Sequence, residues 1–118
     1  MQPDESRYDR GLGRMRAIFG PGIESTLQGL AATSPDLVRC LVEFPFGDIY
    51  YRPGLDLKTR GMLTVAALTV LGYPQAELKD HIRGALNVGC TRDEILEIAG
   101  FAADVFRAAA VPDAHAVT

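Results

Sequence analysis

The sequence contains few cysteines, no excess of positive charge and no long apolar run, and each absence excludes a class of protein. Its 118 residues include two cysteines, Cys40 and Cys90, which lie far apart and form no Cys-x-x-Cys pair. A disulfide framework and a thiol redox motif are therefore unsupported. The 12 basic and 15 acidic residues give a net charge of -3, so no basic surface is expected to attract a nucleic acid.

The apolar segments are too short to cross a membrane. The longest, from Met62 to Tyr73, contains two threonines and a glycine and falls well short of the ~20 residues that a spanning helix needs. The amino-terminal residues are polar and acidic, whereas a secretory signal is basic and then apolar. We therefore expect no membrane association and a cytoplasmic location.

Histidine is also scarce. His81 and His115 have no acidic or cysteine residue three or four positions further along the chain, a spacing that builds zinc sites. The segment from Gly11 to Arg14 begins like a dinucleotide fingerprint but follows no predicted strand. The sequence thus predicts no metal ion and no cofactor.

What the chain does contain is a high hydrophobic fraction, 47%, and regular glycine and proline punctuation. This composition predicts one domain over residues 1–118, with an amino-terminal helical arm at 1–32 and a flexible tail at 113–118. No sustained alternation of polar and apolar residues is present, so the predicted fold is all-α. The predicted helices cover about 6–19, 23–31, 35 onward, 57–71, 74–88 and 92 onward.

The third predicted helix has a clear start signal. Ser34 can cap it, and Pro35 suits its first position, where an N–H would have no partner. Pro45 and Gly47 disturb the helical pattern further along. Three apolar residues share one face of this helix: Leu37, Leu41 and Phe44.

The predicted helix at 57–71, for which Asp56 is the expected cap, has apolar residues around almost its whole circumference. In a domain this small, such a helix must lie at the centre or be covered by another copy of the chain. The sequence therefore predicts a homo-oligomer.

The last predicted helix is amphipathic. Gly89 can end the preceding helix in a left-handed conformation, and Thr91 with Glu94 forms a capping box. Five residues make up its apolar stripe: Ile95, Ala99, Ala102, Phe106 and Ala109.

His81 is the first candidate for chemistry, because it borders the apolar face of the predicted helix at 74–88. A partly buried imidazole can exchange a proton at neutral pH. The alternative is a structural histidine bonded to a backbone carbonyl. Cys90, at a helix boundary, is interpreted as small apolar filler.

A second group of candidates surrounds the segment before Pro53. Its polar and ionisable residues lie among apolar ones, a mixture that is costly to bury without partners; the alternative is a solvated connection. Arg60 is either a surface charge or an anion clamp, since a guanidinium pairs well with a carboxylate. The candidates in this segment are Glu43, Asp48, Tyr50, Tyr51 and Arg52.

Residues 43–60, 77–89 and 91–95 together resemble the carboxymuconolactone decarboxylase family. The resemblance implies an all-helical subunit similar to alkylhydroperoxidase D, built around a helical hairpin and assembled into homotrimers or homohexamers. It also implies a pocket near His81 and the subunit contacts.

The thiol branch of this family has a Cys-x-x-Cys-x-x-x-His signature and an earlier acidic residue. If His81 is the histidine, the cysteine positions fall on Pro74 and Glu77, and the acidic position falls on Gly61. Thiol peroxidase activity is therefore disfavoured, and the decarboxylase branch is the nearer match. Residues 98–103 depart from the segment expected in that branch.

The resemblance implies decarboxylation of a cyclic unsaturated carboxylic acid or lactone. Arg52 or Arg60 would hold a carboxylate, and His81 would supply or relay a proton. Glu43 would orient the imidazole or the substrate. The implied substrate-binding residues are Arg52, Asp48, Tyr50 and Tyr51, with the two tyrosines as donors to a developing enolate. Two alternatives remain open: an isomerase or cyclase acting on another enolisable carbonyl compound, and a non-enzymatic oligomeric module.

Overall fold

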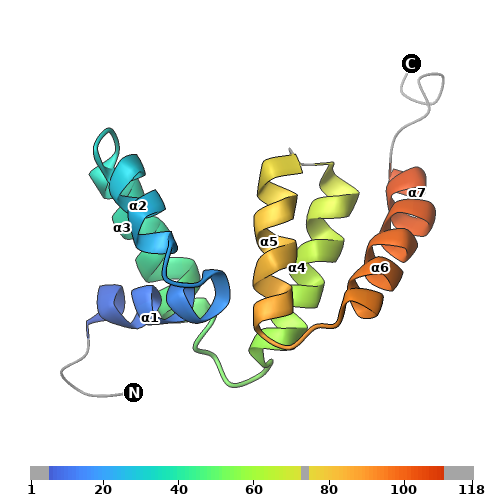
Figure 1. Ribbon diagram of the computed structural model, residues 1–118, viewed down its shortest axis with the longest axis horizontal. Coiled ribbons are helices and arrows are strands. Elements are labelled where there is room, and N and C mark those ends of the chain that lie inside the picture. The colour runs from blue at the N-terminus through green and yellow to red at the C-terminus, as the bar shows by residue number, and fades with distance from the viewer. Residues whose placement is uncertain (1–5, 73–74, 111–118) are drawn as a thin grey trace. The chain divides into compact units, whose positions relative to one another are not determined.

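The computed structural model describes residues 6–72 and 75–110 and confirms the all-α prediction (Figure 1). No residue in these two ranges belongs to a strand. The expected helix start at Pro74 and the expected flexible tail at 113–118, with His115, lie outside them. The elements, of which η1 and η2 are π-helices, are α1 (Arg7–Phe19), α2 (Ile23–Ala31), α3 (Pro35–Leu41), η1 (Val42–Ile49), α4 (Leu57–Leu71), α5 (Gln75–Asn87), α6 (Arg92–Phe101), η2 (Ala102–Arg107) and α7 (Ala108–Ala110).

The chain forms two compact units, an amino-terminal unit over Met1–Leu57 and a carboxy-terminal unit over Lys58–Thr118. Each unit has its own set of buried apolar side chains. The expectation of a single domain stays a prediction.

One predicted helix cap is confirmed and another is wrong. Thr91 with Glu94 forms the predicted capping box. At the start of α1, the Ser6 hydroxyl accepts a hydrogen bond from the Asp9 N–H, a cap that was not predicted. Ser34 does precede Pro35, which occupies the first turn of α3, but its side chain makes no capping hydrogen bond. The backbone explains the difference, because ψ is 68° at Ser34 against 159° at Ser6, outside the extended region from which a cap reaches back.

In the amino-terminal unit, α1 packs closely against η1. The approach is so close that a Cβ at Gly11 would overlap the backbone carbonyl of Val42, and a Cβ at Gly47 would lie 2.6 Å from the Arg7 carbonyl oxygen. Glycine is therefore required on both sides of this contact. The apolar residues buried in this unit are Met15, Ile18, Leu27, Val38, Val42 and Phe46.

The predicted apolar face of α3 and η1, with Leu37, Leu41 and Phe44, is exposed. Leu37 and Phe44 are 57% and 59% exposed, whereas the neighbouring face with Val38 and Val42 faces the core. Both faces are apolar, so the sequence pattern alone could not show which one α1 covers.

The predicted disturbance at Pro45 and Gly47 is confirmed as the π-helix η1. Its wider turn is marked by the Tyr50 N–H, which donates to the Pro45 carbonyl at 2.8 Å. Pro45 has no N–H to donate to the preceding turn, which favours a change of hydrogen-bond register there.

In the carboxy-terminal unit, α4 and α5 form an antiparallel hairpin (Figure 1), followed by α6. Gly89, with a φ of 113°, ends the segment after α5 as predicted. Cys90 is buried, in agreement with its interpretation as filler. The core consists of Val65, Ala85, Cys90 and Ile95, with Met62, Leu78, Ile82 and Ile98 packed against it.

The all-round apolar character of α4 leaves part of it uncovered. Val65 and Leu68 are buried, but Leu63 and Leu71 are 56% and 64% exposed. None of the helices in the described ranges is long and apolar enough to cross a membrane.

The predicted stripe of the last helix is wrong at its carboxyl end. Ile95 and Ala102 are buried, but Phe106 and Ala109 are exposed. The π-helix η2 begins at Ala102, so the angle between successive residues changes and the later members of the stripe leave the buried face.

The Gly11 contact generates a prediction with a control two residues away. Gly11→Ala should lower the free energy of unfolding by about 3 kcal/mol, because the new Cβ meets backbone that cannot rotate away. Gly13→Ala, where a Cβ meets nothing within 4 Å, should raise it by about 0.5–1 kcal/mol through helix propensity. Urea denaturation of both variants measures the difference, and equal stabilities would refute the close α1–η1 contact.

Candidate active site

His81 lies on α5 and borders the core of the carboxy-terminal unit, as predicted. Its side chain is 20% exposed, and its Nε2 lies 3.5 Å from Oε1 of Glu77, one helical turn earlier. Glu77 is 61% exposed, so the pair connects a partly buried imidazole with the solvent. A carboxylate in this position can hold the orientation of the imidazole ring.

Two positions of the thiol signature, occupied here by Glu77 and Gly61, lie close to His81 or to its helix. Glu77, which takes the place of the second cysteine, is the residue that contacts His81. At Gly61, the place of the earlier acid, a Cβ would lie 3.1 Å from Cα of Ala85. A longer side chain at Gly61 would therefore require α4 and α5 to move apart.

Arg60 lies on α4 in the same unit as His81 and is half-buried. Its backbone carbonyl accepts a hydrogen bond from the Thr64 hydroxyl at 2.7 Å. Earlier on the helix, the Lys58 ammonium lies 3.2 Å from the Glu94 carboxylate, which joins the start of α4 to α6.

Asp48 is held by two arginines of α1 in the amino-terminal unit. Arg7 donates from Nε and Nη2 to the two carboxylate oxygens at 3.1 and 2.6 Å. Arg10, which is buried, donates to Asp48 at 3.3 Å and to the Gly47 carbonyl at 2.9 Å. The hydrogen bond from Arg7, with the charges of both arginines, lowers the pKa of Asp48.

The two tyrosines that follow η1 have different neighbours. Tyr50 stacks on Phe46 with ring centroids 4.7 Å apart. Over the Tyr51 ring lie two guanidinium carbons, that of Arg14 at 4.0 Å and that of Arg10 at 5.8 Å from the centroid. Tyr51 is thus a second point, after Asp48, at which arginines of α1 contact the predicted site segment.

The remaining predicted residues of this segment lie on either side of the tyrosines. The Glu43 side chain is mostly buried, and its Oε1 is 4.0 Å from the Arg39 Nε. Arg52 is exposed, and its N–H donates to the Ile49 carbonyl at 3.1 Å.

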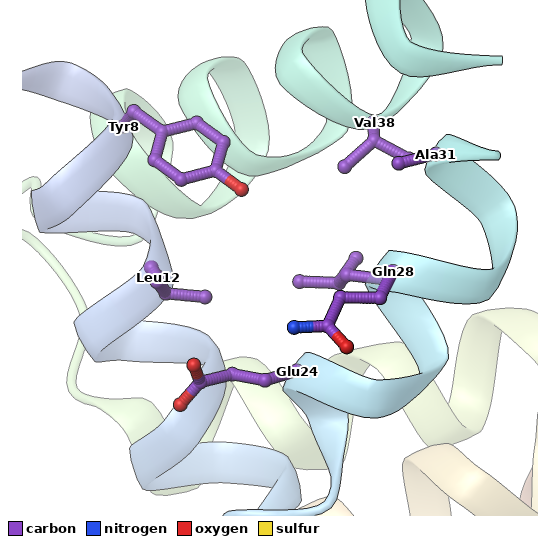
Figure 2. A pocket seen from close by; sticks show the side chains of 7 residues that line it. Tyr8, Leu12, Glu24, Gln28, Ala31 and Val38 are labelled. Atoms are coloured by element: carbon purple, nitrogen blue, oxygen red, sulfur yellow. The ribbon is translucent and has the colours of Figure 1, made fainter.

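A cavity of about 110 Å³ opens in the amino-terminal unit between α1, α2 and α3 (Figure 2). The Tyr8 hydroxyl and the Glu24 and Gln28 side chains supply its polar groups. Ligand pockets for metabolite-sized molecules measure roughly 300–1,000 Å³, so this cavity suits a few waters. None of the predicted site residues lines it. Its lining is completed by Leu12, Leu27, Ala31 and Val38.

The structure places four residues beside the candidates that the sequence did not single out: Arg7, Arg10, Arg14 and Glu77. Glu77 contacts His81, and its signal was the spacing of four residues on one predicted helix. Arg10 and Arg14 meet Tyr51, and their signal was their spacing with Arg7 along one face of the first helix. Because these arginines lie about 40 residues before Tyr51 in the sequence, their periodicity could be seen but their partner could not.

Residues 35–118 match the carboxymuconolactone decarboxylase family. The chain is also 34% identical over 96 residues to the 4-carboxymuconolactone decarboxylase of Acinetobacter baylyi, covering 80% of this chain and 71% of that protein. It is 32% identical over 91 residues to the nitrosuccinic acid decarboxylase of Metarhizium robertsii, covering 76% of this chain. An uncharacterised 15.0 kDa protein of Paracoccus denitrificans is 35% identical over 85 residues, or 70% of this chain. This chain spans 63% of the length of each of the last two relatives.

The Asp48 clamp predicts a pH-dependent contribution to stability. Because the arginines lower the pKa of Asp48 in the folded state, its stabilisation is complete above the unfolded-state pKa of about 3.9 and is lost as the pH falls through the lower folded-state pKa. Asp48→Asn should therefore lower Tm at pH 7, and its difference from wild type should shrink below pH 4. Thermal unfolding between pH 2 and 7 measures this, with Asp36→Asn as a control because that side chain is 90% exposed. A constant difference across the range would contradict the clamp.

Proposed function

The chain belongs to the carboxymuconolactone decarboxylase family, and we propose that it is a carboxy-lyase acting on a small carboxylic acid with an electron-accepting group close to the carboxylate. A cyclic unsaturated acid or lactone is the preferred substrate, and 4-carboxymuconolactone is the first to test. The proposal draws on the family membership, on the names of two relatives and on the environment of His81.

The two relatives named as decarboxylases indicate a common chemistry. Their names specify a carboxylated lactone and a nitro-substituted dicarboxylic acid. Loss of carbon dioxide breaks a carbon–carbon bond and leaves the electron pair on the remaining carbon skeleton. A conjugated carbonyl or a nitro group spreads this charge as an enolate or a nitronate, and one proton then completes the product. The electron sink belongs to the substrate, so we propose no cofactor.

The observation that carries the proposal is the pair formed by His81 and Glu77, with Nε2 and Oε1 3.5 Å apart. We assign His81 as the acid that gives its proton to the developing carbanion and is then reprotonated by water. Glu77 acts as a positioning residue, because its carboxylate lies within reach of Nε2 and orients the ring. Arg60, in the same unit, is proposed to bind a carboxylate that the substrate keeps.

In the amino-terminal unit, the residues proposed to act on substrate are Glu43, Tyr50, Tyr51 and Arg52, on the basis of the family resemblance. Tyrosine hydroxyls can donate to a developing enolate oxygen. Asp48 has a different proposed role: since both its oxygens accept hydrogen bonds from α1 arginines, it positions the segment and does not bind an anion.

A thiol peroxidase mechanism is disfavoured on the same evidence. The chain has Pro74 and Glu77 where the two thiols would stand, and Gly61 where the acid would stand. Cys90 is buried in the core, and Cys40 is exposed on α3.

The chain is also proposed to form a homotrimer or homohexamer. Large apolar side chains are exposed in both units, and surfaces of this kind mark interfaces. Light scattering on the purified protein should give three or six times the mass of one chain, and a monomer would refute the assembly. The exposed apolar side chains include Leu37, Phe44, Leu63, Leu71, Leu96 and Phe101.

The catalytic assignment predicts that His81→Ala lowers kcat on 4-carboxymuconolactone at least ~100-fold, because the proton donor is lost. Glu77→Gln should cause a smaller loss, since it removes the charge beside the imidazole but leaves the ring. A spectrophotometric decarboxylation assay measures both. Lys79→Gln, an exposed change on the same helix, serves as the control. Near-normal turnover by a folded His81→Ala variant would refute the assignment.

A further inference from the structure

Arg14 is the arginine of α1 whose charge has no acidic partner among residues 6–72 and 75–110. Arg7 and Arg10 both hydrogen-bond to Asp48, whereas Arg14 contacts the Tyr51 ring. Its Nε is shielded from solvent and has no hydrogen-bond acceptor in the described part of the chain. A shielded donor of this kind is destabilising unless something accepts its hydrogen bond.

The surroundings of Arg14 prepare it to receive an anion. The Tyr51 ring, 4.0 Å from the guanidinium carbon, attracts the cation and restricts its plane. Arg10 adds a second guanidinium 5.8 Å from the same ring, so positive charge accumulates around Tyr51. Of the nearby carboxylates, Asp48 pairs with Arg7 and Arg10, and Glu43 acts on Arg7.

The geometry of a guanidinium decides which anion fits. The Arg14 guanidinium carbon lies over the Tyr51 ring. Because Nε is shielded while the side chain as a whole is half-buried, the two Nη groups are the donors offered to an incoming anion. A carboxylate meets these donors with two parallel hydrogen bonds. Two parallel hydrogen bonds from one guanidinium satisfy both oxygens of a carboxylate group, whereas a phosphate keeps further charged oxygens without a donor.

We propose that Arg14, held against Tyr51, forms a carboxylate-binding site in the amino-terminal unit that takes small organic acids. Arg14 lies outside residues 35–118, which match the family, so the family match assigns it no role. The proposal does not depend on the decarboxylation proposed above, because binding is measured without turnover.

Titration of the arginine Nε–Hε signals with succinate tests this site on the ¹⁵N-labelled full chain. Through-bond correlations assign the signals, so the measurement does not require a variant to fold. The Arg14 signal should shift and saturate. The Arg16 signal should stay in place, because its Nε already donates to Glu24 at 2.6 Å. An unmoved Arg14 signal would overturn the proposal, as would an equal shift with sodium chloride at the same ionic strength.

Two further experiments test which class of anion binds and whether the planar guanidinium of Arg14 is needed. Inorganic phosphate should shift the Arg14 signal less than succinate does at equal concentration; a stronger response to phosphate would overturn the carboxylate assignment. Arg14→Lys, which keeps the charge but loses the planar fork, should weaken succinate binding at least tenfold in isothermal titration. The matched variant Arg16→Lys should bind succinate as wild type does. Unchanged affinity in a folded Arg14→Lys variant would contradict the proposal.

Discussion

The close backbone contact between α1 and η1 is the constraint on which the amino-terminal unit depends. Glycines at positions 11 and 47 let the two helices approach until no side chain fits between them. This approach brings Arg7 and Arg10 within hydrogen-bond distance of Asp48 and places Arg14 over Tyr51. The π-helix that contains Pro45 directly precedes both tyrosines. The positions of Tyr50 and Tyr51 therefore depend on how the backbone of η1 packs against α1.

In the carboxy-terminal unit, the proposed proton chemistry depends on the residue at position 77. Glu77 stands where a thiol would serve redox chemistry, and its carboxylate is the group that lies beside His81. Gly61 packs against Ala85 and keeps α4 and α5 close, so the acidic side chain of the thiol branch would push these two helices apart. The chemistry proposed for this pair is proton transfer by the imidazole to the carbon that loses carbon dioxide.

The helices could be predicted from the sequence because glycine and proline mark their ends locally, as at Gly20 and Gly89. The π-helices could not, since the predicted apolar stripe from Ile95 to Ala109 assumed a constant angle per residue, and η2 changes that angle. His81 could be placed at the border of the core from periodicity alone. The Arg14–Tyr51 contact joins residues far apart in the sequence, and only the folded packing of α1 against η1 specifies it.

The central claim is that the protein releases carbon dioxide and protonates the carbon left behind. Incubation of wild-type protein with 4-carboxymuconolactone in deuterium oxide, followed by mass spectrometry and NMR of the product, tests it directly. The account predicts carbon dioxide release and one solvent deuteron in the product, bonded to the carbon skeleton that carried the charge. A product that retains the carboxylate, or no product at all, would contradict it.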